Sequence, residues 1–106
     1  MKIFKLEDMT GGWFVGDFSP SVVKTKECEV ALKEYKAGDK ENRHHHKEAI
    51  EVTLIARGTV EMNGNILEEG SIIQLDKGES TDFKSITDSI TVVFKSPSVT
   101  NDKYLD

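Results

Sequence analysis

The chain has 106 residues, a formal net charge of −5 and a single cysteine. This length suits one domain, which can bury roughly 65% of the surface that its unfolded chain exposes. The negative charge argues against nucleic acid or an anionic membrane as the main partner. No apolar run is long enough to span a membrane, and the first residues lack the apolar core of a signal peptide. Because Cys28 has no partner for an internal disulfide, we expect a reducing compartment and a cytoplasmic protein.

Strand patterns follow one another along the chain, and no segment has the pattern of a long helix. Some segments alternate apolar and polar residues, as half-buried strands do, and others are short β-branched runs. Such patterns lie at residues 11–18, 28–33, 52–56, 72–75 and 90–95. We therefore predict an all-β fold.

Turn signals separate these strands at intervals typical of a small sandwich or barrel. The strongest is Asn63-Gly64, because this dipeptide adopts positive φ at low cost and matches the twist of a hairpin. No linker or repeat divides the chain. The expected single domain has an N-terminal strand or arm (1–26), a barrel core (27–96) and a C-terminal tail (97–106).

The three histidines of the chain are consecutive. On an extended strand His44 and His46 point to one side and His45 to the other. The carboxylate of Glu51 returns to the first side only if the chain bends between residues 47 and 50. Two imidazole nitrogens and one carboxylate would then converge, which suits a divalent transition metal.

The spacing around these histidines resembles the first signature motif of the cupin superfamily. That motif has two glycines, two histidines and a glutamate, matched here by Gly38, His44, His46, Glu51 and Gly58. The second motif is degenerate, since only its two glycines are kept. Its five positions align on Gly70, Asp76, Gly78, Thr81 and Ser85. The resemblance implies a cupin-type double-stranded β-helix, or jelly-roll, barrel.

The resemblance also implies the ligands of a metal. His44, His46 and Glu51 would be three of them, and Thr81 stands in place of the usual fourth, a histidine. A threonine hydroxyl is a poor ligand for iron, manganese, zinc or nickel, and the pattern does not distinguish among these metals. By strand parity, the residues that face the same pocket would be Thr81, Phe83 and Ser85.

Two functions remain open at this point. In the first, a metal with open positions makes the protein an oxygenase, isomerase or lyase that acts on a small polar metabolite. In the second, the pocket is metal-free and binds a sugar or another small ligand as a sensor, without catalysis. Glu51 is also a candidate catalytic residue, since in a metal-free pocket it and a histidine would be available for proton transfer or for sugar binding. The competing carboxylate, Glu48, is better interpreted as surface charge.

The strand expected around residues 50–56 is apolar on both faces, with Val52 and Leu54 on one and Ile55 on the other. A strand of this kind is covered on both faces. The resemblance favours a homodimer as the second cover. The alternative is that loops or the N-terminal segment cover this face.

Overall fold

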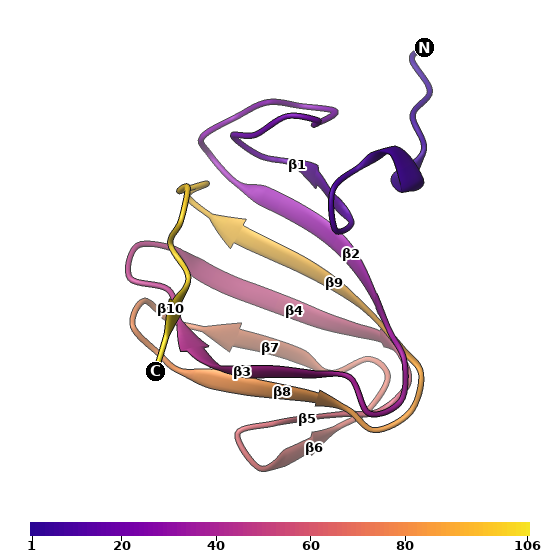
Figure 1. The fold of residues 1–106 in the computed structure, drawn as a ribbon, viewed down its shortest axis with the longest axis vertical. Coiled ribbons are helices and arrows are strands. Elements are labelled where there is room, and N and C mark those ends of the chain that lie inside the picture. Colours follow the sequence, from indigo (N-terminus) through magenta and orange to yellow (C-terminus); the bar gives the residue numbers. More distant parts are fainter.

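The computed structural model describes all 106 residues and consists almost entirely of β-strands in two five-stranded antiparallel sheets (Figure 1). The first, here called the β9 sheet, has the order β1-β2-β9-β4-β7, and the second, the β8 sheet, has the order β10-β3-β8-β5-β6. The predicted all-β jelly roll is confirmed. The strands are β1 (Trp13–Val15), β2 (Glu29–Tyr35), β3 (Lys40–His45), β4 (Ile50–Arg57), β5 (Val60–Met62), β6 (Asn65–Leu67), β7 (Ile72–Leu75), β8 (Thr81–Ser85), β9 (Ser89–Ser96) and β10 (Tyr104–Leu105).

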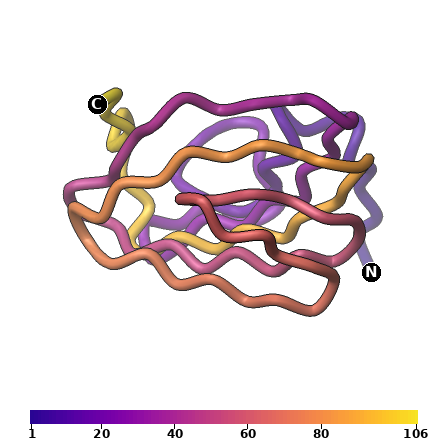
Figure 2. Tube along the Cα trace, turned by 90° about the horizontal axis from the view of Figure 1, so that it is seen from below, coloured from indigo at the N-terminus to yellow at the C-terminus, as the bar shows by residue number.

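The two sheets pack face to face, and the chain ends lie on opposite sides of the molecule (Figure 2). An apolar core fills the end of the barrel near the turn from β4 to β5. Its buried members are Ile55, Val60, Met62, Leu75 and Phe83. Because the apolar side chains gather at this end, the other end of the barrel is left for polar groups.

The polar end depends on which parity of the β9 sheet faces inward. In the register, Lys95 of β9 lies opposite both Glu29 of β2 and Glu51 of β4, and these three side chains line the interior. The apolar side chains at the alternate positions of these strands, such as Val30, Val52 and Phe94, therefore point outward. Phe94, for which core packing is the natural expectation, is 39% exposed on this outer face.

Two turns show why the sequence needs glycine where it does. Asn63 and Gly64 have φ values of 49° and 78°, which confirms the tight turn predicted between β5 and β6. Gly58 has a φ of 84°, and a Cβ at this position would collide with the carbonyl oxygen of Asp88. Only glycine fits there, directly after the strand that carries Glu51.

The C-terminal tail returns across the open end of the barrel, as the yellow segment in Figure 1 shows. It ends in β10, whose Tyr104 pairs with His45 and whose Leu105 pairs with His44. At the other terminus, β1 adds an edge strand to the β9 sheet beside β2. The one helical segment is the 3-10 turn Leu6–Asp8, and no helix could cross a membrane.

Candidate functional site

The open end of the barrel holds a cavity of about 440 Å³ between the two sheets and the tail. Small-molecule pockets in proteins have volumes of roughly 300–1,000 Å³. The cavity is lined by the predicted residues His44, His46, Glu51, Thr81 and Phe83, together with side chains of β2, β9 and the tail. The cavity is therefore large enough for a small metabolite.

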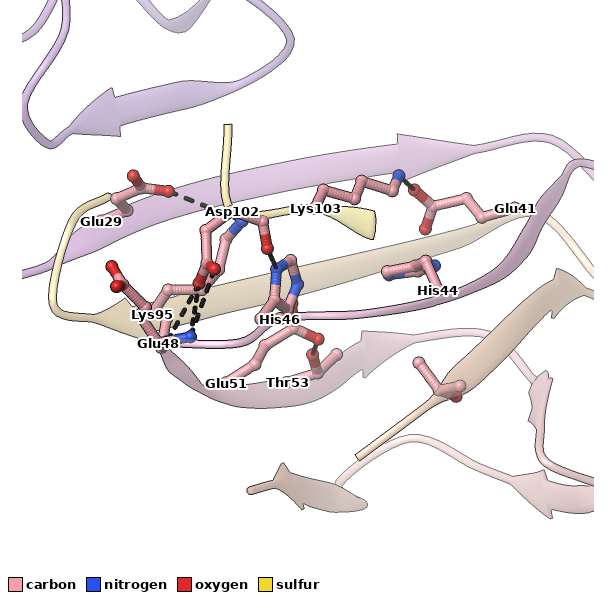
Figure 3. Close-up of polar contacts among 12 residues, drawn as sticks. Glu29, Glu41, His44, His46, Glu48, Glu51, Thr53, Lys95, Asp102 and Lys103 are labelled. Carbon is pink, nitrogen blue, oxygen red and sulfur yellow. Dashed lines mark hydrogen bonds and ion pairs between the residues drawn. The ribbon is translucent and has the colours of Figure 1, made fainter. Parts of the chain in front are cut away.

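The chain bends at Lys47 and Glu48, as the spacing of the histidines and the carboxylate requires. The bend brings His46 Nε2 to 3.3 Å from Glu51 Oε1. The rings of His44 and His46 lie edge to face with their centres 5.6 Å apart, and both are at least 94% buried. All three side chains thus line one cavity. Figure 3 shows His46 between Asp102 and Glu51, with His44 farther along on β3.

Asp102 in the C-terminal tail holds this bend in place. Its carboxylate accepts hydrogen bonds from the backbone N–H groups of Lys47, Glu48 and Ala49 at 3.0–3.2 Å. Its backbone carbonyl oxygen accepts a further hydrogen bond from His46 Nδ1 at 2.7 Å. In Figure 3, Asp102 lies above His46 and Glu51 lies below it. Asp102 is therefore a positioning residue for the predicted site.

Backbone carbonyl groups also set the state of both imidazole rings. His44 Nδ1 lies 2.8 Å from the carbonyl oxygen of Asn42, as His46 Nδ1 does from that of Asp102. A carbonyl oxygen only accepts, so each Nδ1 carries the hydrogen. In the neutral rings both Nε2 atoms are then lone-pair donors, the form that binds metals. His46 Nε2 is buried and has no hydrogen-bond partner.

Two imidazole nitrogens and a carboxylate are suitable ligands for a divalent metal, but these side chains do not converge on one point in the structure. No three histidine, cysteine, aspartate or glutamate side chains form a group that could hold a metal ion as they stand. A neutral His46 would place its Nε2 lone pair against a Glu51 oxygen at 3.3 Å, which is repulsive. Either a proton on His46 or a cation between the two groups would remove the repulsion.

Strand β8 places the other predicted pocket residues as parity requires. Thr81, Phe83 and Ser85 are buried, while Asp82 and Lys84 are exposed. Thr81 lies directly across from His44, and its hydroxyl donates to the carbonyl oxygen of Asp82 at 2.7 Å. Ser85 shares this face but does not line the cavity.

Two further residues of the histidine region face away from the cavity lining. His45 Nδ1 contacts Asp106 Oδ1 at 2.6 Å, and the His45 ring stacks on Tyr104. Glu48 is exposed, in agreement with its interpretation as surface charge.

Several charged and aromatic residues of the cavity were not predicted from the sequence. On β3, the four residues from Glu41 to His44 oppose three on β8, and this bulge turns Glu41 inward on the same face as His44. Glu41 forms an ion pair with Lys103 at 3.4 Å. On the opposite sheet Lys95 forms an ion pair with Glu29 at 3.6 Å. The remaining unpredicted lining residues include Trp13, Phe18, Lys33, Tyr35 and Thr91.

No family model and no curated protein sequence matches the chain. Solved structures do match it. An uncharacterised conserved protein with a double-stranded β-helix domain from Klebsiella pneumoniae is 18% identical, with a TM-score of 0.72 over 98% of this chain and 90% of that one. KdgF from Halomonas sp. is 17% identical, with a TM-score of 0.66 over 73% of this chain and 74% of that one. The DMSP lyase DddQ from Ruegeria pomeroyi is 15% identical, with a TM-score of 0.70 over 86% of this chain and 48% of that one. An RmlC-like cupin from Shewanella frigidimarina is 18% identical, with a TM-score of 0.67 over 72% of this chain and 71% of that one. The chain has the cupin fold.

The residues aligned on the two motifs lie at turns and on neighbouring strands of this fold. The first motif runs from the turn at Gly38 along β3 and β4 to the turn at Gly58. The second runs from the turn at Gly70 through Gly78 into β8. Because β3 pairs with β8, the degenerate position Thr81 comes to lie beside His44. The aligned position therefore faces the same cavity as the first motif.

The charge of Glu51 is maintained in spite of its burial in this fold. Burial alone would raise the pKa of Glu51, but the polar contact with His46 and the positive charges of Lys95 and of protonated His46 and His44 outweigh it, so the pKa is lowered in the metal-free protein. Burial, with the nearby Glu41 carboxylate, raises the pKa of Tyr35, which stays protonated. Glu51 is therefore an anion at neutral pH, available to a cation or a proton donor.

We expect the lowered pKa of Glu51 to appear in the acid stability of the metal-free protein. A carboxylate whose pKa is lower in the folded state stabilises fully above its unfolded value of 4.5 and loses that contribution as the pH falls through the folded value. The Glu51→Gln variant should therefore lose less unfolding free energy than the unsubstituted protein below about pH 4.5. Urea unfolding between pH 3 and pH 7 measures this. An equal flattening in Glu48→Gln, whose carboxylate is exposed, would contradict the assignment.

Proposed function

We propose that this cupin binds a small polar molecule in the cavity, next to a divalent metal ion held by His44, His46 and Glu51. The observation that carries the proposal is the state of the two imidazole rings. Both Nδ1 atoms are occupied by backbone carbonyl oxygens, and the buried Nε2 of His46 is left without a partner beside Glu51. A metal ion is the partner that suits a neutral imidazole and a carboxylate together.

The charge of the cavity lining supports a cation. Five carboxylates face three lysine ammonium groups, which leaves a net charge of −2 when the histidines are neutral. A divalent ion would balance this charge. The carboxylates are Asp17, Glu29, Glu41, Glu51 and Asp102, and the lysines are Lys33, Lys95 and Lys103.

In an enzyme of this kind, the metal and the residues of the cavity would have different roles. A bound metal would supply a Lewis acid that polarises a substrate oxygen. Glu51 would then be occupied as a ligand, and it is the candidate to accept a proton from a bound molecule only in the metal-free cavity, where its lowered pKa makes it a weak base. DddQ, which shares the fold, is a lyase by name, and this supports an enzyme of the oxygenase, isomerase or lyase kind.

A second candidate is favoured by the same contact. Because no three ligating groups are drawn together, the 3.3 Å approach of His46 Nε2 and Glu51 Oε1 also fits a protonated histidine paired with the carboxylate. The cavity would then be metal-free and bind a sugar or another small ligand as a sensor, without catalysis.

Elemental analysis of protein purified without a histidine tag and without chelators tests the proposal. We expect about one iron, manganese, zinc or nickel ion per chain, and none in the His44→Ala/His46→Ala double variant. Occupancy should fall between pH 7 and pH 5, because a protonated imidazole does not coordinate. Metal-free protein that still binds a ligand would favour the second candidate instead.

We further propose that a second copy of the chain covers the outer face of the β9 sheet. Apolar side chains from four adjacent strands lie half-exposed or exposed on this face, and the N-terminal Leu6 and Met9 border a hollow beside Leu32. The outward residues are Val30, Leu32, Val52, Leu54, Ile72, Val92 and Phe94. A contiguous apolar patch of this kind is typical of an interaction site.

Light scattering at micromolar concentration should give twice the mass of one chain. The Phe94→Glu variant should give the mass of one chain, because it places a charge in the middle of the covered face. A monomer at every concentration of the unsubstituted protein would contradict the dimer.

A further inference from the structure

One lysine in the cavity has no carboxylate partner. Lys95 is paired with Glu29 and Lys103 with Glu41, each at less than 4 Å. Lys33 of β2 lines the same cavity, is half-buried and forms no ion pair. A half-buried ammonium group that faces a cavity without a partner is a natural contact for an anionic ligand group.

Thr91 of β9 is an independent sign of a missing partner at the same place. Thr91 is 1% exposed and lines the cavity, and its hydroxyl oxygen has no hydrogen-bond partner. In the strand register it lies directly opposite Lys33. Buried hydroxyl groups are nearly always hydrogen-bonded in native proteins, so an incoming polar group is expected here.

Trp13 forms the wall beside these groups. The Nζ atoms of Lys33 and Lys95 lie 5.4 and 4.8 Å from the centre of its ring. The ring therefore keeps both ammonium groups at one side of the cavity. Trp13 is the only tryptophan of the chain and reports directly on this region.

We propose that Lys33 and Thr91 bind the carboxylate group of a small organic acid, with Trp13 as the wall of this subsite. The proposal rests on the proposed function, since the ligand enters the same cavity. Lys33 donates from its ammonium group and Thr91 from its hydroxyl group. The candidate metal ligands His44, His46 and Glu51 border the same cavity as Lys33 and Thr91. A molecule whose carboxylate binds Lys33 would therefore share the cavity with the metal.

The charges around Lys33 favour a carboxylate over phosphate. The pKa of Lys33 is lowered overall, chiefly because the side chain is partly buried. The charges of Glu41 and Glu51 oppose this shift, and those of Lys103 and Lys95 add to it. A bound anion would favour the charged ammonium. In the metal-free protein the carboxylates of the lining outnumber its lysines, so a dianion would be repelled more strongly than a monoanion there.

Titration of Trp13 fluorescence with acetate, pyruvate and glucuronate tests the proposal, with glucose and inorganic phosphate as comparisons. We expect a saturable change with at least one of the carboxylates and none with glucose. Lys33→Gln should weaken binding about tenfold or more, since it removes a charged hydrogen bond. Lys84→Gln, which changes an exposed lysine on β8, should bind as the unsubstituted protein does.

Thr91→Val makes the test independent of folding defects. This substitution keeps the shape of the side chain and removes the unpartnered hydroxyl, so the free protein should melt at the same or a higher temperature while carboxylate binding weakens. Equal carboxylate affinity in Lys33→Gln and the unsubstituted protein, tighter binding of phosphate, or no response to any carboxylate would overturn the proposal. Metal content measured on the same Lys33→Gln sample separates this outcome from failure of the metal site, because Lys33 is not among the proposed ligands.

Discussion

Replacement of Asp102 by alanine should lower the free energy of unfolding by about 3–5 kcal/mol, one of the largest effects of any single substitution in this chain. The carboxylate is buried and accepts hydrogen bonds from three consecutive backbone N–H groups. Without it these donors have no protein partner, and the segment between His46 and Glu51 loses its support. Urea unfolding of the metal-free protein measures the change.

Asp106 offers a matched control in the same tail. Its side chain contacts His45 and Arg43 but none of the cavity groups, so Asp106→Ala should change stability much less. The ¹⁵N resonances of the His46 ring give a readout that general destabilisation would not move. Asp102→Ala keeps the backbone carbonyl that His46 Nδ1 contacts, so we expect the Nδ1–H preference to weaken only because the unsupported bend moves away from the tail. Unfolding free energies that are the same in the two variants would contradict the positioning role.

Introduction of histidine at position 81 should tighten metal binding by about 10- to 100-fold. Thr81 is 2% exposed and lies across from His44 on the face that lines the cavity. An imidazole there would add a protein ligand where the present donor set has three. A chelator competition titration with zinc or manganese measures the affinity of Thr81→His against that of the unsubstituted protein.

Lys84→His is the control for this experiment. It places the same side chain on the same strand but on the exposed face, so the affinity at the cavity should not change. If Thr81→His bound metal no more tightly than Lys84→His, the alignment of the second motif on Thr81 would be wrong.

The general fold could be predicted because short-range signals agree with it. Asn63-Gly64, the glycine turns and the alternating strands predict a small all-β barrel, and the structure has one. The joint placement of His44, His46 and Glu51 was also accessible, because two strands joined by a bend need only local geometry.

The charged side of the cavity could not be predicted in the same way. Alternation identifies a half-buried strand but not which parity faces the interior. In β2 and β9 the polar parity faces inward, so that Lys33 and Lys95 line the cavity and Phe94 lies outside. Open-ended barrels with a polar interior reverse the usual assignment of the apolar face to the core.

Two further features depend on long-range or irregular structure. Glu41 faces inward only because a bulge on β3 changes the parity between it and His44. Asp102 reaches the bend from more than fifty residues along the chain, and an aspartate in a polar tail carries no local sign of this contact. The first depends on the pairing of β3 with β8 and the second on the path of the tail across the barrel.

Diffraction from metal-bound crystals at the absorption edge of the bound ion would locate the metal itself. We expect one anomalous peak per chain, in the cavity and within roughly 2.0–2.2 Å of the Nε2 atoms of His44 and His46 and of a Glu51 oxygen. A stoichiometric metal whose peak lies elsewhere, or crystals soaked in metal that show His46 paired with Glu51 and no peak between them, would contradict the proposed metal site.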